Sequence, residues 1–154
     1  MANSIRHQIM DAVIAALNAI AAGATYNSTV KYVSEAFEGY QEIDIKNLPA
    51  VFPIDTDETR SPGAIGAGGA DDTESELKIV CTCMVYNPRN TTRQARTDLM
   101  RDVEKALVND TSLAALISSI EPSEVTTDQG TIPNYSIWDQ TFIITYYYNS
   151  TAGG

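Results

Sequence analysis

Alternation of apolar and polar residues marks two long strands in this chain. In residues 77–86, every second side chain is apolar and would lie on one face of an extended strand. Residues 135–148 alternate in the same way near the end of the sequence. Apolar residues also occur on the opposite face of both segments, so we expect the two strands to lie inside a sheet. The core positions predicted in them are Leu77, Ile79, Cys81, Cys83, Val85, Phe142 and Ile144.

A helix is predicted between these strands, at residues 92–108. Its apolar residues recur every three or four positions, and they include the predicted core residues Leu99 and Val103. Arg93, Arg101 and Lys105 follow one another at multiples of four residues on the opposite side. We call these three residues the basic ridge. The ridge is either a solvated helix face or a surface that meets an acidic surface of a neighbouring copy.

The first 22 residues predict an amphipathic helix that begins after Ser4 and ends at Gly23. Its apolar residues cover about half of the helix circumference, which is wider than the roughly 100° needed to cover a sheet. We therefore expect part of this surface to meet another subunit. A cleaved secretory signal at residues 1–24 is the alternative, although Asp11 and Asn18 interrupt the apolar run.

Weaker patterns predict the remaining elements. β-Branched and aromatic residues favour a strand at 29–37, and a short strand at 50–54 contains a proline typical of a sheet edge. A short helix is expected to begin at Asp110 or Thr111, followed by a strand at 124–127 and a turn at 128–130.

Residues 55–76 show no pattern typical of a core, and we predict a long acidic, glycine-rich loop there. Seven acidic residues accompany a single base, Arg60. A loop of this length inside a compact domain is typically disordered alone or functional in an assembly. The acidic residues are Asp55, Asp57, Glu58, Asp71, Asp72, Glu74 and Glu76.

These elements together predict an α/β (α+β) fold. We expect a mixed, mainly antiparallel sheet of four to five strands, with the N-terminal helix and the central amphipathic helix packed on it. Residues 1–149 would form a single domain, and residues 150–154 would be a disordered tail.

Charge and cysteine content narrow the possible functions. The chain has 154 residues and a net charge of −10, which disfavours tight binding to the phosphate backbone of nucleic acids.

Cys81 and Cys83 are two positions apart on one strand face, a separation of about 6.6 Å that disfavours a disulfide between them. We expect them to be buried thiols. No segment has the roughly 18–20 apolar residues of a membrane span.

Residue types that could carry chemistry are few. His7, the only histidine, precedes Asp11 by one helical turn, but no activated nucleophile accompanies this pair. The glycine-rich run at 63–70 lacks the Gly-Lys-Ser/Thr of a phosphate-binding loop, and the acids lack the spacing of a calcium loop. Trp138 lies on the same face of the predicted last strand as Phe142 and Ile144, so we expect it to pack in the core. We therefore expect no catalytic site, cofactor or metal, and no enzyme activity.

The order of these elements resembles that of the lambda-type tail terminator, or tail completion, proteins of tailed bacteriophages. The resemblance covers most of the chain but is one of order and pattern, without a diagnostic motif. The segments that carry it are the leading helix at 5–20, the strand Leu-Pro-Ala-Val-Phe-Pro-Ile at 48–54, the strand at 76–86 with the helix at 92–108, the Ser-Leu-Ala-Ala-Leu turn at 112–116, and the closing strand at 135–148.

The resemblance implies a structural virion protein in the neck of the tail. It implies a homohexameric ring that caps the tail tube, stops its polymerisation and meets the head connector, while DNA passes through the lumen without being gripped. A head-to-tail ring needs two different complementary patches on each subunit. The candidate contact residues are those of the basic ridge, Arg93, Arg101 and Lys105, and the loop acids Asp55, Asp57, Glu58, Asp71 and Asp72.

Two other classes remain open from the sequence. A secreted or periplasmic adhesion or ligand-binding module would use residues 1–24 as a signal peptide and the Asn-x-Ser/Thr sequences as glycan sites. A small cytosolic enzyme or ligand-binding domain would need a closed pocket around His7 or Trp138.

Overall fold

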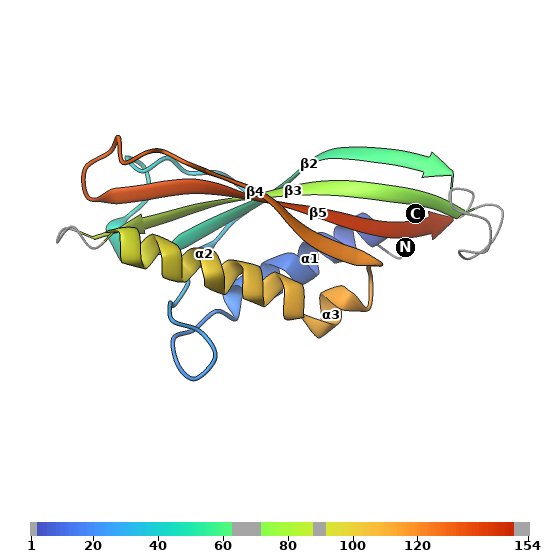
Figure 1. Ribbon diagram of the computed structural model, residues 1–154, viewed down its shortest axis with the longest axis horizontal. Coiled ribbons are helices and arrows are strands. Elements are labelled where there is room, and N and C mark those ends of the chain that lie inside the picture. The colour runs from blue at the N-terminus through green and yellow to red at the C-terminus, as the bar shows by residue number, and fades with distance from the viewer. Residues whose placement is uncertain (1–2, 63–71, 88–91, 150–154) are drawn as a thin grey trace.

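The protein folds as one five-stranded sheet with its three α-helices on a single face (Figure 1). The computed structural model describes residues 3–62, 72–87 and 92–149. In chain order the elements are α1 (Ile5–Asn18), β1 (Tyr32–Val33), the 3₁₀ helix η1 (Ile45–Asn47), β2 (Ala50–Pro62), β3 (Asp72–Tyr86), α2 (Thr92–Asn109), α3 (Thr111–Ala114), β4 (Ser119–Thr127) and β5 (Tyr135–Asn149).

The sheet has the strand order β1-β2-β3-β5-β4. The short β1 runs parallel to β2, and the other neighbouring strands are antiparallel. This arrangement confirms the predicted α+β class, with a mixed, mainly antiparallel sheet. β3 and β5 occupy the centre and pair along their full length, from Asp72 with Asn149 to Tyr86 with Tyr135. The alternation that identified these two strands reflects burial of one face, while the opposite face is mostly half-buried.

The main core lies between the sheet and the helices. Odd-numbered residues of β3 and even-numbered residues of β5 face α1 and α2, and Trp138 is 1% exposed among them. All nine predicted core residues are buried, with exposed fractions of 2% or less. Burying apolar area on this scale is the main force that holds the helices on the sheet. These residues are Leu77, Ile79, Cys81, Cys83, Val85, Leu99, Val103, Phe142 and Ile144.

A second, smaller core lies on the opposite face of the sheet, at one end. Residues 34–49, which we call the lobe, cover this end. Ile43 and Leu48 of the lobe pack with Phe52 of β2 and Met84 of β3, and tyrosines of the neighbouring strands surround them. The helices and the lobe thus cover opposite faces of the sheet.

The predicted loop at 55–76 is wrong over most of its length. β2 continues to Pro62 and β3 begins at Asp72, so the two strands extend together and pair up to Pro62 with Thr73. With the last residues of β5 they form a three-stranded arm that reaches past the helices on the right of Figure 1. The part of the predicted loop at 63–71, Asp71 included, and the side chain of Asp72 lie outside the described residues.

Other element boundaries also differ from the predictions. α1 ends at Asn18, four residues earlier than expected, while Ser4 caps its start as predicted by accepting a hydrogen bond from the His7 N–H at 3.2 Å. The strand predicted at 29–37 is reduced to Tyr32–Val33. β4 starts at Ser119, five residues before the predicted start, and contains a register shift after Pro122.

The wide apolar surface of α1 serves the core. Ile9, Val13 and Leu17 are fully buried, and Ile5 packs at the margin of the same core. Ile14 is half-buried. This burial explains the breadth of the apolar arc without a contact to another subunit. Among the helices of the described residues, none has the length and hydrophobicity of a membrane span.

Candidate assembly surfaces

The basic ridge lies on the exposed side of α2. Arg93, Arg101 and Lys105 are all exposed, and Arg96 between them is half-buried. Within the described residues no carboxylate lies within ion-pair distance of any of these four cations. Lys105 Nζ donates instead to the Thr25 carbonyl at 2.7 Å and lies 5.8 Å from the centre of the Tyr26 ring. The arginines of the ridge therefore have full charge available for a partner.

Asp102, the residue after Arg101, is used inside the subunit. It is 1% exposed, and its Oδ2 accepts hydrogen bonds from the backbone N–H groups of Asn27 and Ser28 at 3.0 and 2.7 Å. A buried carboxylate is stable only with such donors. Asp102 thus anchors the segment after α1 to α2, and the ridge sits on a fixed helix.

The acids of the arm are placed differently from what the loop prediction implied. Arg6 of α1 binds Asp55, with Nε to Oδ2 at 2.7 Å, and lies 3.6 Å from Glu58. Arg60 binds Glu58 at 2.7 Å, and its guanidinium lies 5.3 Å from the centre of the Tyr148 ring. Asp55 and Glu58, two candidate contact residues, are therefore already paired within the subunit. Asp57 is exposed.

Glu58 is the centre of this network. Its side chain is only 5% exposed, and the Tyr146 hydroxyl donates a short hydrogen bond to its Oε1. Burial by itself raises the pKa of Glu58, but the hydrogen bonds from Tyr146 and Arg60 outweigh it and hold the pKa below its usual value. Burial and the bond to Glu58 raise the pKa of Tyr146 to about 12. The network fixes the arm to α1.

The residues considered for chemistry do not form a site. His7 and Asp11 make an exposed pair at 3.4 Å, next to an open cleft that also contains Glu35. Burial raises the pKa of both cysteine thiols, to about 12 for Cys81, so neither thiol is a reactive nucleophile. Trp138 lies in the core and donates through Nε1 to Gln140 at 2.9 Å. In the described part of the chain, no group of three or more His, Cys, Asp or Glu residues could hold a metal ion.

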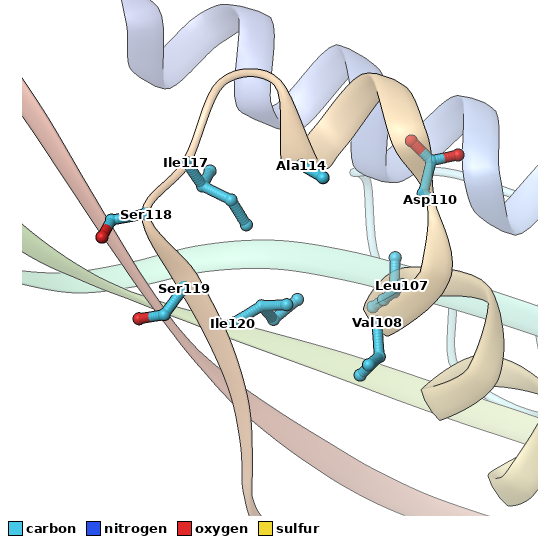
Figure 2. Close-up of a pocket in the computed structure, with 8 residues that line it drawn as sticks. All are labelled: Leu107, Val108, Asp110, Ala114, Ile117, Ser118, Ser119 and Ile120. Atoms are coloured by element: carbon cyan, nitrogen blue, oxygen red, sulfur yellow. The ribbon is translucent and has the colours of Figure 1, made fainter.

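A pocket of about 190 Å³ opens where the end of α2, α3 and the start of β4 meet. Figure 2 shows the side chains of Val108, Ile117 and Ile120 around this space. Val108 is 42% exposed at the rim, whereas Leu107 behind it is buried. Eight residues line the pocket: Leu107, Val108, Asp110, Ala114, Ile117, Ser118, Ser119 and Ile120. Five of these residues are apolar and suit an aromatic or aliphatic side chain, whereas Asp110, Ser118 and Ser119 make the rest of the lining polar.

The lobe combines exposed apolar side chains with a net negative charge, on the other side of the sheet. Phe37 is 53% exposed and Ile45 is 48% exposed, although the Phe37 ring stands edge-on to the buried Phe52 at 5.4 Å. Four acids and one base, Lys46, lie within the lobe, which gives it a charge of −3. The acids are Glu35, Glu38, Glu42 and Asp44. Sequence reasoning missed this surface because Phe37 was placed at the end of a strand.

Both edges of the sheet carry backbone groups that could meet another chain. β1 pairs with β2 only at Ala50 and Val51, so the rest of β2 is an edge. β4 forms the other edge, where Pro122 and the register shift after it interrupt the strand. Proline and irregular pairing are features that hinder strand addition at an edge. Contacts through side-chain surfaces are therefore better supported here than extension of the sheet.

Comparison with known proteins gives no family for this chain. No protein family model matches it, and no curated protein matches it at a significant level.

Proposed function

We propose that this chain is a bacteriophage tail terminator, a structural protein that forms a ring on the tail tube. The ring would stop polymerisation of the tube and join the tail to the head connector. The observation that carries the proposal is the separation of charge. α2 presents arginines that have no acidic partner among the described residues, and the lobe, which carries a charge of −3, packs on the other face of the sheet. Two different complementary surfaces are what a head-to-tail ring requires.

The order of elements supports the same function. A leading helix, a strand that follows Leu48 and Pro49, the strand β3 with α2 behind it, and the closing β5 occur in the order on which the resemblance to tail terminators rests. The agreement concerns architecture, which many functions share. The charge separation therefore remains the argument for assembly.

The proposed partners follow from the position of such a ring. One face would meet the tail tube protein and the other the head-tail connector protein, and a hexamer would enclose the lumen. A subunit with a net charge of −10 repels phosphates, so DNA would pass through the ring without being bound. We place the protein in the virion, at the neck of the tail, after assembly in the host cytoplasm.

The proposed role needs no catalysis. The exposed His7–Asp11 pair has no activated nucleophile beside it, and the two thiols lie in the core. We therefore propose that the chain acts through its surfaces and is not an enzyme.

The alternative, a secreted adhesion or ligand-binding module, conflicts with the position of α1. Loss of residues 1–24 would remove Ile9, Val13, Leu17 and Ile20 from the core, where each is at most 1% exposed. It would also remove Arg6 from the network around Glu58. The mass of the protein from its natural source distinguishes the two functions, because a mature chain that begins near Ala24 would refute the terminator.

Tail length tests the proposed function directly. Tails are assembled with and without this protein, and their lengths are measured by negative-stain electron microscopy. Tubes of unregulated length should form without the protein, and adding it should restore a uniform length. A uniform length in its absence would refute the proposal. Leu99→Asp, which places a charge in the core beneath α2, provides a misfolded control that should fail to restore length regulation.

A further inference from the structure

The exposed Phe37 is the most unusual apolar residue on the surface. More than half of its side chain is exposed in a subunit that buries its other two phenylalanines, Phe52 and Phe142, almost completely. Glu38 follows it in the sequence and weakly accepts a hydrogen bond from the Tyr32 hydroxyl at 3.4 Å, whereas Glu35 lies in the cleft with Arg6 and His7 of α1. An exposed aromatic residue with charged neighbours is typical of an anchor in a protein interface.

The pocket between α2, α3 and β4 has matching properties. Its lining is apolar at Leu107, Val108, Ile117 and Ile120, and its volume of about 190 Å³ provides space for a phenyl ring. The one carboxylate in the lining, Asp110, accepts a hydrogen bond from the Leu113 N–H at 2.7 Å as the cap of α3. That carboxylate is therefore engaged by the helix that it caps.

Two cations of α2 lie on the same side of the helix as Val108, which lines this pocket. Arg101, Lys105 and Val108 are spaced at i, i+4 and i+7, which places them on one stripe of the helix. Glu104 also lies on α2, but it borders a separate hollow with Pro122 and Val125 on β4. Arg101 and Lys105 therefore lie on the same stripe as Val108 at the rim of the pocket, with the Lys105 ammonium at the Thr25 carbonyl, whereas Glu38 is the charged neighbour of Phe37.

We infer that Phe37 of one copy inserts into the pocket at Val108 of a second copy, with the acids of the lobe against Arg101 and Lys105 of α2. This inference rests on the proposed ring and names the contact that builds it. The lobe and the helices cover opposite faces of the sheet, so each subunit gives Phe37 to one neighbour and receives it from the other. Such a contact is heterologous and can close into a ring.

Photo-crosslinking between isotopically different copies tests the contact. Phe37 is replaced by p-benzoyl-phenylalanine in an unlabelled chain, and this chain is mixed with an unsubstituted ¹⁵N-labelled chain. The mixture is irradiated in two preparations, one free in solution at high concentration and one bound to tail ends. A protease that cuts after glutamate, but not before proline, releases residues 105–124, which include all eight residues of the pocket lining. Crosslinks from position 37 to the ¹⁵N form of this peptide are expected.

The control places the same photo-reactive residue at Val125, which has a comparable exposed fraction of 46%. Position 125 should give no crosslink to the peptide 105–124 of a labelled partner. Equal crosslinking from both positions, or crosslinks from position 37 that avoid the labelled peptide in both preparations, would overturn the inference.

A charge swap adds a test of specificity. Glu38→Lys, next to Phe37, and Arg101→Glu each place like charges across the proposed contact, and each should raise the concentration at half-assembly by about tenfold or more at low salt. The combined variant restores opposite charges and should assemble within about threefold of the original chain. Failure of the combined variant to recover, while both single variants assemble poorly, would contradict a direct contact between these two surfaces.

The two proposals fail in different ways. If tails are length-regulated by this protein but position 37 crosslinks elsewhere, the contact is wrong and the terminator function stands. If position 37 crosslinks to the pocket of a second copy but tails reach uniform length without the protein, the contact stands and the function is wrong.

Discussion

The arm and the basic ridge both carry several charged residues, but these residues differ in whether they form ion pairs within the chain. In the arm, Asp55 and Glu58 are neutralised by Arg6 and Arg60 of the same subunit. On α2, the arginines of the ridge have no such partner among the described residues. Charge in the arm holds the subunit together, while charge on the ridge remains available to another molecule.

This difference changes which surface is expected to meet the ridge. The sequence alone suggested the acids at 55–76, and two of these are engaged within the subunit. In the lobe, Asp44 is paired with Lys46 and Glu38 is half-buried, but the segment keeps a charge of −3 that can face the ridge. Counting acids along the chain therefore does not identify free charge, because the fold decides which carboxylates already have a cation.

The largest effect on stability is expected from Asp102→Ala, on the inner side of the ridge helix. The substitution removes a buried carboxylate that accepts two backbone N–H groups, so the free energy of unfolding should fall by about 3 kcal/mol in urea denaturation. Asp98→Ala, one turn earlier on α2, is the control and should change it by about 0.5 kcal/mol at most. Equal effects would contradict the anchoring role of Asp102.

Glu58→Gln should have the next largest effect, at the centre of the arm. The free energy of unfolding should fall by about 1.5–2 kcal/mol at pH 7, because the variant loses the charge that holds Arg60 and Arg6. Glu76→Gln on the same arm, where the carboxylate is exposed and outside every ion pair of the described residues, should be nearly neutral.

The pH dependence of the Glu58 effect has a definite sign. The pKa of Glu58 is lower in the folded protein than its usual value of 4.5, so its contribution to stability is fully present above that pH. The contribution is lost as the pH falls through the lowered pKa of the folded state. The stability difference between the original chain and Glu58→Gln should therefore shrink below about pH 4.5. A difference that grows on acidification would show that the pKa is raised instead.

The smallest effect on the subunit is expected from Arg101→Glu. Its side chain is exposed and has no ion pair to lose within the described residues, so the free energy of unfolding should change by about 0.5 kcal/mol or less. Assembly of the same variant, measured by light scattering, should weaken strongly. A loss of stability above about 1.5 kcal/mol would mean that Arg101 is needed inside the subunit, and the contrast with the arm would disappear.

Sequence patterns could predict the centre of the fold because both central strands bury apolar residues at every second position. β3, β5 and α2 follow this rule, and their predicted core residues are confirmed. The arm does not follow it. Its positions that face α1 include Glu58 and Arg60, which are held by ion pairs and a tyrosine, so the alternation of apolar residues that marks a strand is absent there.

The lobe and the first half of β4 were missed for related reasons. Residues 34–49 are mostly irregular and are fixed by a few contacts of Ile43 and Leu48 with the far face of the sheet, which no periodic pattern indicates. β4 contains Pro122 and exposes most of its residues, so it lacks the apolar face of a typical strand. The basic ridge itself was predictable, since helical spacing places its cations together, but whether they had internal partners depended on the tertiary structure.

Electron microscopy of tails that carry a labelled copy of this protein shows directly whether the protein forms a ring at the end of the tail tube. A small tag at the C-terminal end, bound by a gold particle or an antibody fragment, marks the position of the protein on purified tails. If the protein is a tail terminator, we expect label only at the end of the tube that meets the head, arranged as a single ring. Label along the tube, at the opposite end or absent from the tails would contradict it.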